Sequence, residues 1–182
     1  MKDLMRLQAP IMRQEDLAHI WNILDTTSSA QVAENLQDIL QVTALKLVSE
    51  TFEYLLSLVR QSFHEGADEN KDQLLIFLHK IGEETASSNV QKSHAVLDLI
   101  WELARHPSLC IDLIDKAITF YIQILGSIPH RKSLIESYIS KCIGEIRENA
   151  VFVALRQLNI LLQALLDNSF NKTECVSLNI CR

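Results

Sequence analysis

Apolar residues recur at helical spacing along almost the whole chain, without the sustained alternation of period two that marks half-buried strands. The pattern predicts about eight helices, the first from about Glu15 to Leu24 and the last over Val151 to Leu166. We expect these inward stripes: Val32, Leu36, Ile39, Thr43 and Leu47; Phe52, Leu55, Val59 and Phe63; Leu74, Phe77, Leu78 and Ile81; Ile111, Ile114, Ile118, Tyr121 and Leu125; Leu134, Tyr138, Cys142 and Ile146.

Polar, glycine and proline residues separate these stripes at regular intervals. Ser28 or Ser29 is expected to cap the second helix, and Asp68 or Asn70 the fourth, because a side-chain oxygen can accept an orphaned backbone amide. The fifth helix should open at Ser87-Ser88-Asn89 and end at His106, since Pro107 disfavours helical backbone before it, and Gly126 with Pro129 should close the sixth. The fifth helix is apolar around much of its circumference, so we expect it between neighbouring helices.

A short internal similarity points to helical repeats. The segment Leu17-Ala-His-Ile-Trp-Asn-Ile-Leu resembles Leu97-Asp-Leu-Ile-Trp-Glu-Leu, with Trp21 and Trp101 displaced by 80 positions. Two repeats of about 40 residues, the length of HEAT and armadillo units, would produce this displacement. The predicted fold class is all-α, with about eight helices in antiparallel pairs forming an armadillo/HEAT-like α-solenoid segment.

Composition supports long helices and one domain. The 182 residues include only 4 Gly and 3 Pro, fewer than an all-β fold or a nucleotide-binding α/β fold would need. Hydrophobic residues make up 48% and charged residues 22%, which is typical of a folded globular chain. We expect a lead-in over residues 1–14, a single helical-repeat domain over residues 15–168 and an irregular tail over residues 169–182.

Charge and hydropathy bear on partners and location. The formal net charge is −6 and only His130-Arg131-Lys132 forms a basic run, so binding to nucleic acid or to an anionic membrane surface is not expected. Neither a signal peptide nor a membrane span is recognisable, which favours a cytoplasmic protein whose cysteines remain thiols. The glycosylation acceptor at Asn171 then has no role.

No residue pattern predicts a catalytic, cofactor or metal site. His64-Glu65 has Asp68 where a zinc-binding His-Glu-x-x-His motif needs its second histidine. His106 and Cys110 are four residues apart but Pro107 intervenes and no second pair completes a metal site. Cys110 is also the one cysteine with a histidine nearby in sequence, yet no local signature of a nucleophile surrounds it. Cys142 is expected in the core, and Cys175 and Cys181 lie in the predicted tail.

Two further features have a structural and a functional interpretation. Trp21 and Trp101 could anchor a partner, but their positions within hydrophobic stripes favour packing in the core. The acidic segment from Glu65 to Asp72 could meet a basic partner, but a solvated loop between helices is the preferred interpretation.

The amino-acid sequences of the predicted fifth and sixth helices are distinctive. The segments are His94-Ala-Val-Leu-Asp-Leu-Ile-Trp-Glu-Leu-Ala-Arg-His106, Ile111-Asp-Leu-Ile-Asp-Lys-Ala-Ile118 and Tyr121-Ile-Gln-Ile-Leu125. They resemble the helical region of the giant fat facets-type ubiquitin-specific proteases. Glu15 to Trp21, Val32 to Leu40, Ile146-Arg-Glu-Asn149 and Ala154 to Leu158 are similar to the same region in the same order, so the resemblance covers roughly residues 15–166.

This resemblance implies an armadillo- or HEAT-like region outside the catalytic domain of a ubiquitin-specific cysteine protease. The family's cysteine and histidine boxes have no counterpart here, so no catalytic residue carries over and the chain itself is not expected to be an enzyme. The leading hypothesis is a non-catalytic scaffold or substrate-recruiting segment whose partners are other proteins and the remaining domains of a larger chain. Alternatives are an independent helical-repeat adaptor with no protease attached and, less favoured, a small helical enzyme using Cys110 and a histidine.

Overall fold

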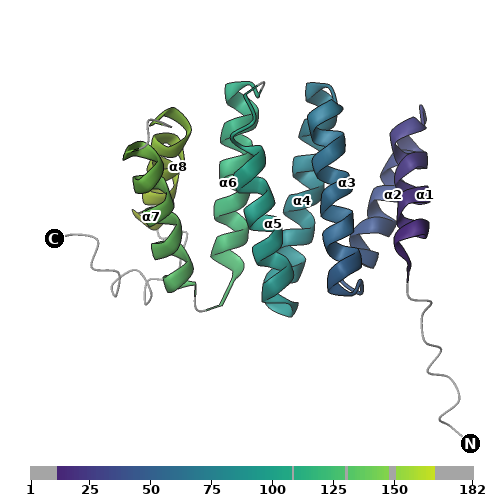
Figure 1. Cartoon of the computed structure of the whole chain (residues 1–182), viewed down its shortest axis with the longest axis horizontal. Helices are drawn as coiled ribbons and strands as arrows, with labels where there is room; N and C mark the ends of the chain where they lie inside the picture. The colour runs from purple at the N-terminus through teal and green to yellow at the C-terminus, as the bar shows by residue number, and fades with distance from the viewer. Residues whose placement is uncertain (1–11, 108, 130, 148–150, 167–182) are drawn as a thin grey trace, which may run out of the picture.

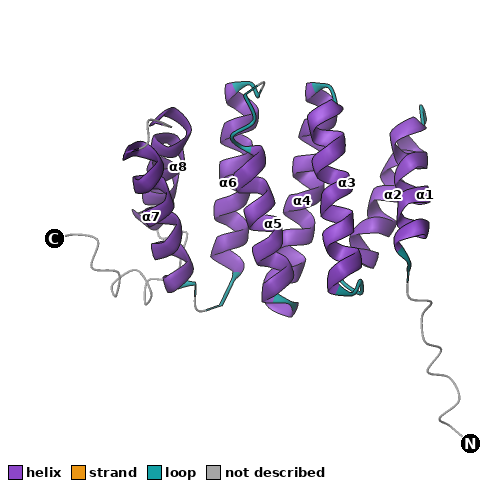
Figure 2. Cartoon of the chain, viewed as in Figure 1, coloured by secondary structure: helices purple, strands orange, loops and turns teal. Residues whose placement is uncertain are grey.

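A computed structural model describes residues 12–107, 109–129, 131–147 and 151–166. Within them every regular element is an α-helix, joined by short loops (Figure 2). The helices are α1 (Gln14–Thr26), α2 (Ala30–Ala44), α3 (Ser49–Glu65), α4 (Asp68–Ser88), α5 (Val90–Leu103), α6 (Ile111–Ser127), α7 (Lys132–Arg147) and α8 (Val151–Leu166). The predicted fold class and the expected series of eight helices are confirmed for this part of the chain.

The helices stack as antiparallel pairs along one axis, from α1 and α2 at one end to α7 and α8 at the other (Figure 1). Odd-numbered helices form one layer, in which α1 contacts α3 and α3 contacts α5. Even-numbered helices form the second layer, where α2, α4, α6 and α8 contact one another in sequence order. Each pair therefore packs mainly on the pair before it and the pair after it, as in an α-solenoid.

Side chains about one repeat apart link successive pairs. Arg60 forms a bidentate ion pair with Glu102, 42 positions later, at 2.9 Å from each oxygen. Lys116 reaches Asp72 across 44 positions, and the Tyr138 hydroxyl donates to Asp98 across 40. Similar separations recur in both layers, which confirms the repeat of about 40 residues predicted from Trp21 and Trp101.

The core follows most of the predicted stripes. All four inward residues predicted for α3 are buried, and so are the four predicted for α4. Helix α5 contacts α3, α4 and α6, as expected for a helix with little polar surface. Its residues Val96, Leu97, Ile100 and Leu103 are at most 1% exposed.

Three expected core positions are wrong. Val32 and Ile39 of α2 are 41% and 50% exposed because their side of the helix has no neighbouring pair among the described residues. Ile111 is 53% exposed because it is the first residue of α6, beyond the edge of the adjacent helices. Leu47 is buried as predicted, but it lies in the turn after α2.

Helix ends also depart from the sequence predictions. Helix α5 begins after Asn89, within the expected Ser87-Ser88-Asn89, and the Asn89 side chain accepts from the Lys92 amide at 3.2 Å. Ser29 stands at the N-cap of α2 without a side-chain cap bond, and Ala67 rather than Asp68 or Asn70 is the N-cap of α4. Helix α5 ends at Leu103, before the predicted His106, because the amides of Arg105 and His106 turn back to carbonyls three residues earlier.

The last turn of α2 is stabilised from a distant helix. Lys92, 6% exposed in α5, donates from Nζ to the carbonyl oxygens of Ala44 and Leu45, both at 2.9 Å. These are carbonyls that a helix end leaves without an intrahelical partner. Burial lowers the pKa of the Lys92 ammonium, and the Phe52 ring lies 5.1 Å from Nζ.

The predicted lead-in and tail lie almost wholly outside the described residues, as do Cys175, Cys181 and Asn171, and these remain predictions. Among the helices that the structure describes, none is both long enough and apolar enough to cross a membrane.

Candidate partner-binding edge

The turns α1–α2, α3–α4 and α5–α6 lie along one edge of the stack, at the top of Figure 1. Two adjoining hollows of about 470 and 180 Å³ open between the first two of these turns. Both are lined by Asp25 at the end of α1 and by Ser62 and Glu65 at the end of α3. We call the surface that runs from these hollows to the start of α6 the turn edge.

A hydrogen-bonded chain forms the wall of the first hollows. The Trp21 indole Nε1 donates to the Ser62 hydroxyl at 2.9 Å, and that hydroxyl donates to Asp25 Oδ2 at 3.1 Å. Burial raises the pKa of the Asp25 carboxyl, the Ser62 hydrogen bond opposes this, and the negative charge of Glu65 raises the pKa further. The two carboxylates thus face the same space and repel each other.

A third hollow of about 370 Å³ continues the turn edge toward α6. It is lined by four carboxylates, from Asp68, Glu69, Asp72 and Asp112. The first three belong to α4, so the acidic segment is largely the first turns of a helix and not the solvated loop preferred from the sequence. Acidic side chains stabilise a helix N-terminus by interacting with its dipole, which explains their position without a ligand.

The hollows of the turn edge are lined by six carboxylates, from Asp25, Glu65, Asp68, Glu69, Asp72 and Asp112. None of the described residues lining the three hollows is Lys, Arg or His. Lys116 pairs with Asp72 at 2.5 Å, and Lys71 lies 3.4 Å from Asp68. These two lysines do not line the hollows, but they partly neutralise two of the six carboxylates that do. A cationic side chain of another protein would be attracted here, most strongly at low ionic strength.

His106, in the connection between α5 and α6, lies among aromatic rings. Its imidazole is 4.7 Å from that of His64 and 6.3 Å from the Phe63 ring, measured between centroids. Burial lowers the pKa of His106, and the nearby His64 and Lys71 lower it further. Cys110 is exposed at the N-cap of α6, and no group of three or more potential metal ligands occurs in the described part of the chain.

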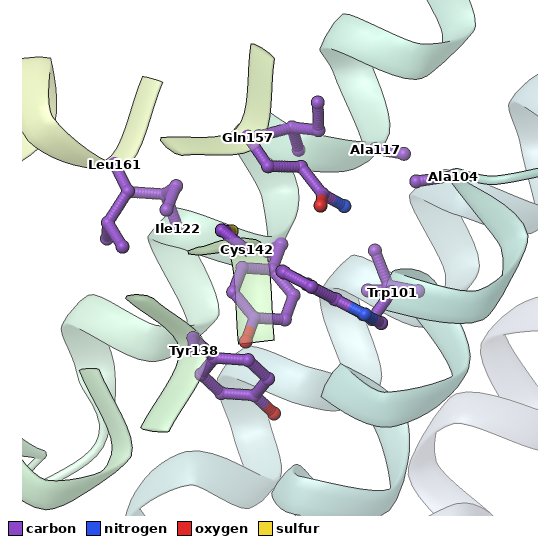
Figure 3. A pocket seen from close by; sticks show the side chains of 11 residues that line it. Trp101, Ala104, Ala117, Ile122, Tyr138, Cys142, Gln157 and Leu161 are labelled. Carbon is purple, nitrogen blue, oxygen red and sulfur yellow. The ribbon is translucent and has the colours of Figure 1, made fainter. Parts of the chain in front are cut away.

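Cys142 lines a small apolar cavity between α5, α6, α7 and α8 (Figure 3). Its volume is about 10 Å³, roughly the space for one water molecule and far too small for a substrate. Burial raises the pKa of the Cys142 thiol to about 11, and the charge of Glu145 contributes in the same direction. This thiol is therefore protonated near neutral pH, as expected of a core cysteine.

The two tryptophans differ in burial. Trp21 is 4% exposed and lies 6.1 Å from the Phe77 ring, as predicted for a core residue. Trp101 is only half-buried, between the rings of Tyr121 and Tyr138 and beneath the Arg105 guanidinium, whose Cζ is 4.0 Å from its ring centroid. Its outer face is thus covered by a cation of its own chain, which leaves little of it to anchor a partner.

Sequence reasoning missed the turn edge as a unit. Asp25 and Ser62 stand 37 positions apart, and neither belongs to a recognisable motif. The one available signal was the repeat length, because residues about 40 positions apart occupy neighbouring pairs. Applied to the helix ends, that spacing would have grouped Asp25, Glu65 and the start of α6.

The geometry is that of a helical-repeat segment, and comparison with known proteins agrees. Residues 1–179 match the family model described as the UBP24/USP9X/USP9Y ARM repeat. The chain belongs to this ARM-repeat family. Among related proteins, human ubiquitin carboxyl-terminal hydrolase 24 is 33% identical over 147 residues, covering 80% of this chain and 6% of that protein.

More distant relatives show the same relation. Ubiquitin carboxyl-terminal hydrolase 9X of Mus musculus is 26% identical over 148 residues, covering 79% of this chain and 6% of the relative. The human ubiquitin carboxyl-terminal hydrolase 9Y is 25% identical over the same length. The chain thus spans a small fraction of the length of the curated relatives that it matches.

Proposed function

We propose that this chain is a non-catalytic segment of a large cytoplasmic deubiquitinase, and that it recruits or holds protein partners. Membership of the ARM-repeat family supports the link to deubiquitinases, because the relatives are named ubiquitin carboxyl-terminal hydrolases. Its partners are other proteins and the remaining domains of the larger chain, not nucleic acid or membrane. The observation that carries the recruiting role is the turn edge, a row of carboxylate-lined hollows across three helix pairs.

The partner that fits the turn edge is an extended basic segment. Glu65 lines the first two hollows and Glu69 the third, and both side chains are exposed. Lysine or arginine side chains could reach these carboxylates without displacing an internal ion pair. Affinity from such contacts should fall as salt is raised, because exposed charges are screened.

The non-catalytic part is tested with a ubiquitin-derived fluorogenic substrate and a ubiquitin-based thiol-reactive probe. The isolated chain should neither turn over the substrate nor become labelled, because thiol proteolysis needs an activated thiolate held against an oriented histidine. Cys110→Ser is the essential comparison, since Cys110 is an exposed thiol. Turnover that disappears in this variant would make the chain an enzyme and overturn the assignment.

The recruiting part is tested by cross-linking in lysate followed by mass spectrometry. Glu65→Lys/Glu69→Lys reverses two charges on the turn edge, whereas Glu50→Lys/Glu53→Lys makes the same change on exposed residues at the start of α3. Each pair includes one acid from the first turn of a helix, so the effects on helix stability are matched. Partners with basic segments should be lost only from the turn-edge variant; equal retention by both variants would reject this surface.

A further inference from the structure

The α7–α8 pair is joined to the α5–α6 pair differently from the way in which the earlier pairs are joined. In the odd-numbered layer α3 contacts both α1 and α5, but the α7 backbone hardly approaches α5 or α6. It lies against α8, and α8 in turn contacts α6. The α7–α8 pair is therefore attached through one helix of the two. We call the boundary between these two pairs the α6–α8 joint.

Long side chains bridge the space between α5 and α7. The Tyr138 ring of α7 lies 5.3 Å from the Trp101 ring of α5, and both rings lie beside the cavity in Figure 3. The Tyr138 hydroxyl donates to Asp98 at 3.4 Å, and Lys141 lies 3.5 Å from the same carboxylate. Polar and aromatic side chains thus replace the direct packing that joins α3 to α5.

Ion pairs cross the α6–α8 joint in both layers. Arg105, just after α5, pairs with Glu145 of α7 and donates to Gln157 of α8 at 3.0 Å. In the other layer Arg156 of α8 pairs with Asp115 of α6, and this hydrogen bond lowers the pKa of the Asp115 carboxyl. The four charged side chains are 25–39% exposed, so dissolved salt reaches them and screens their attraction.

Apolar packing is less complete at this joint than at the one before it. The small cavity beside Cys142 lies where α5, α6, α7 and α8 meet. Side chains around a cavity lose dispersion contacts, so separating them costs less. By contrast, Gly82 of α4 packs so closely on Ile124 of α6 that a side chain would not fit between them.

We propose that the α6–α8 joint is a salt-sensitive hinge, at which the α7–α8 pair undocks while the first three pairs stay packed. Interfaces that depend on polar contacts commonly allow such relative motion. Every residue that lines the turn-edge hollows belongs to the first three pairs, so the turn edge keeps its shape when the hinge opens. The chain thus combines a fixed edge with a movable helix pair. Because the joint lies between described helices, it is present in a segment of a longer chain as well.

The Cys142 thiol reports on opening, because the residue is only 1% exposed in the closed joint. The full chain is treated with N-ethylmaleimide, an uncharged thiol reagent, and modification of Cys142 is followed by peptide mass spectrometry. Dividing this rate by that of the denatured chain in the same buffer gives the open fraction. The open fraction should rise at least about threefold between about 0.05 M and about 1 M NaCl, because salt screens the ion pairs.

Two double variants locate the effect. Glu145→Gln/Asp115→Asn removes one ion pair from each layer of the joint and should raise the open fraction at least about tenfold, with a weaker response to salt. Glu102→Gln/Asp72→Asn is the matched control, since it makes the same carboxylate-to-amide changes at the two ion pairs between α3–α4 and α5–α6. It should leave the labelling of Cys142 unchanged. Circular dichroism verifies that both variants stay helical.

Hydrogen exchange separates undocking from global unfolding. Amides of α3 and α4 should have a smaller open fraction than Cys142, because the first three pairs stay packed. An equal open fraction would mean that the reagent reaches Cys142 only through global unfolding, and that no hinge exists. Labelling of the wild-type chain that does not respond to salt, or that both double variants accelerate equally, would also overturn the proposal.

Discussion

Gly82 shows how closely a single residue can determine the distance between two repeats. It is buried in α4 opposite Ile124 of α6, and a Cβ added there would lie 2.8 Å from Ile124 Cγ1 and closer still to Cδ1. Ile124 is itself 0% exposed, so it has little room to move. Gly144 of α7 is the opposite case, because an added Cβ would meet nothing within 4 Å.

Alanine at these two glycines should change stability in opposite directions. Gly82→Ala should lower the free energy of unfolding by about 1–3 kcal/mol, since overpacking a filled core forces its neighbours to shift. Gly144→Ala should raise it by about 0.5–1 kcal/mol, because alanine loses less backbone entropy in a helix. Denaturant unfolding measures both. In Gly82→Ala/Ile124→Val the combined loss should be smaller than the sum of the single losses; simple additivity would show that the two side chains do not collide.

Residue-level predictions from the sequence succeeded where a position is enclosed by its own and both adjacent helix pairs. Phe52, Phe63 and Leu78 were placed in the core by periodicity alone, and all are at most 1% exposed. Trp101 has a similar local pattern but is only half-buried, because α5 ends within a turn of it and Arg105 folds back over its ring. Periodicity identifies the side of a helix but not what covers that side.

Between elements, ion pairs and hydrogen bonds join successive helix pairs. Arg105, just after α5, pairs with Glu145 of α7, donates to Gln157 of α8 at 3.0 Å and to the Trp101 carbonyl oxygen at 2.6 Å. It therefore ties the last pair to the rest of the stack. Arg60 and Glu102 make a similar link between α3 and α5, but their side chains are 43% and 49% exposed, against 25% and 26% for Arg105 and Glu145.

Arg105→Met should cost about 2 kcal/mol of unfolding free energy and Arg60→Met less than about 1 kcal/mol. The difference follows from solvent screening of the exposed pair and from the charged and polar partners that Arg105 leaves unsatisfied. Hydrogen exchange provides the local readout, in which amides of α7 and α8 should exchange faster in Arg105→Met. Equal effects of the two variants, or unchanged exchange in the last pair, would mean that apolar packing alone holds α7 and α8 in place.

Helix boundaries illustrate the same dependence on neighbours. The start of α5 was predicted within Ser87-Ser88-Asn89, and the structure assigns the cap to Asn89, whose side chain accepts from a backbone amide three residues later. The end of α2 was not recognisable, since its last carbonyls are satisfied by Lys92 from a helix more than 40 positions later. Local signals therefore placed helix boundaries only approximately, at both starts and ends.

At the scale of the whole molecule, the stack has a filled middle and two apolar ends. The pairs α3–α4 and α5–α6 are covered on both sides, so their stripes are buried as predicted. The end pairs have one covered side each within the described residues, and their remaining stripes face outward. The same hydrophobic pattern thus produces core in the middle of the stack and exposed apolar side chains on the end pairs of the described residues.

The sequence by itself determined the all-helical class, the series of helices found in the described residues and the repeat of about 40 residues, because helical periodicity and repeat length are local properties of the chain. The family followed from a resemblance between ordered sequence motifs and not from periodicity. Only the tertiary structure decided which stripes are covered, because burial depends on whether another pair lies beside a helix. It also brought Asp25, Glu65 and Asp112 onto one edge, since residues in equivalent turns of a stack become neighbours regardless of their distance in sequence. The surfaces named here are created by stacking, and periodicity alone does not distinguish them from core.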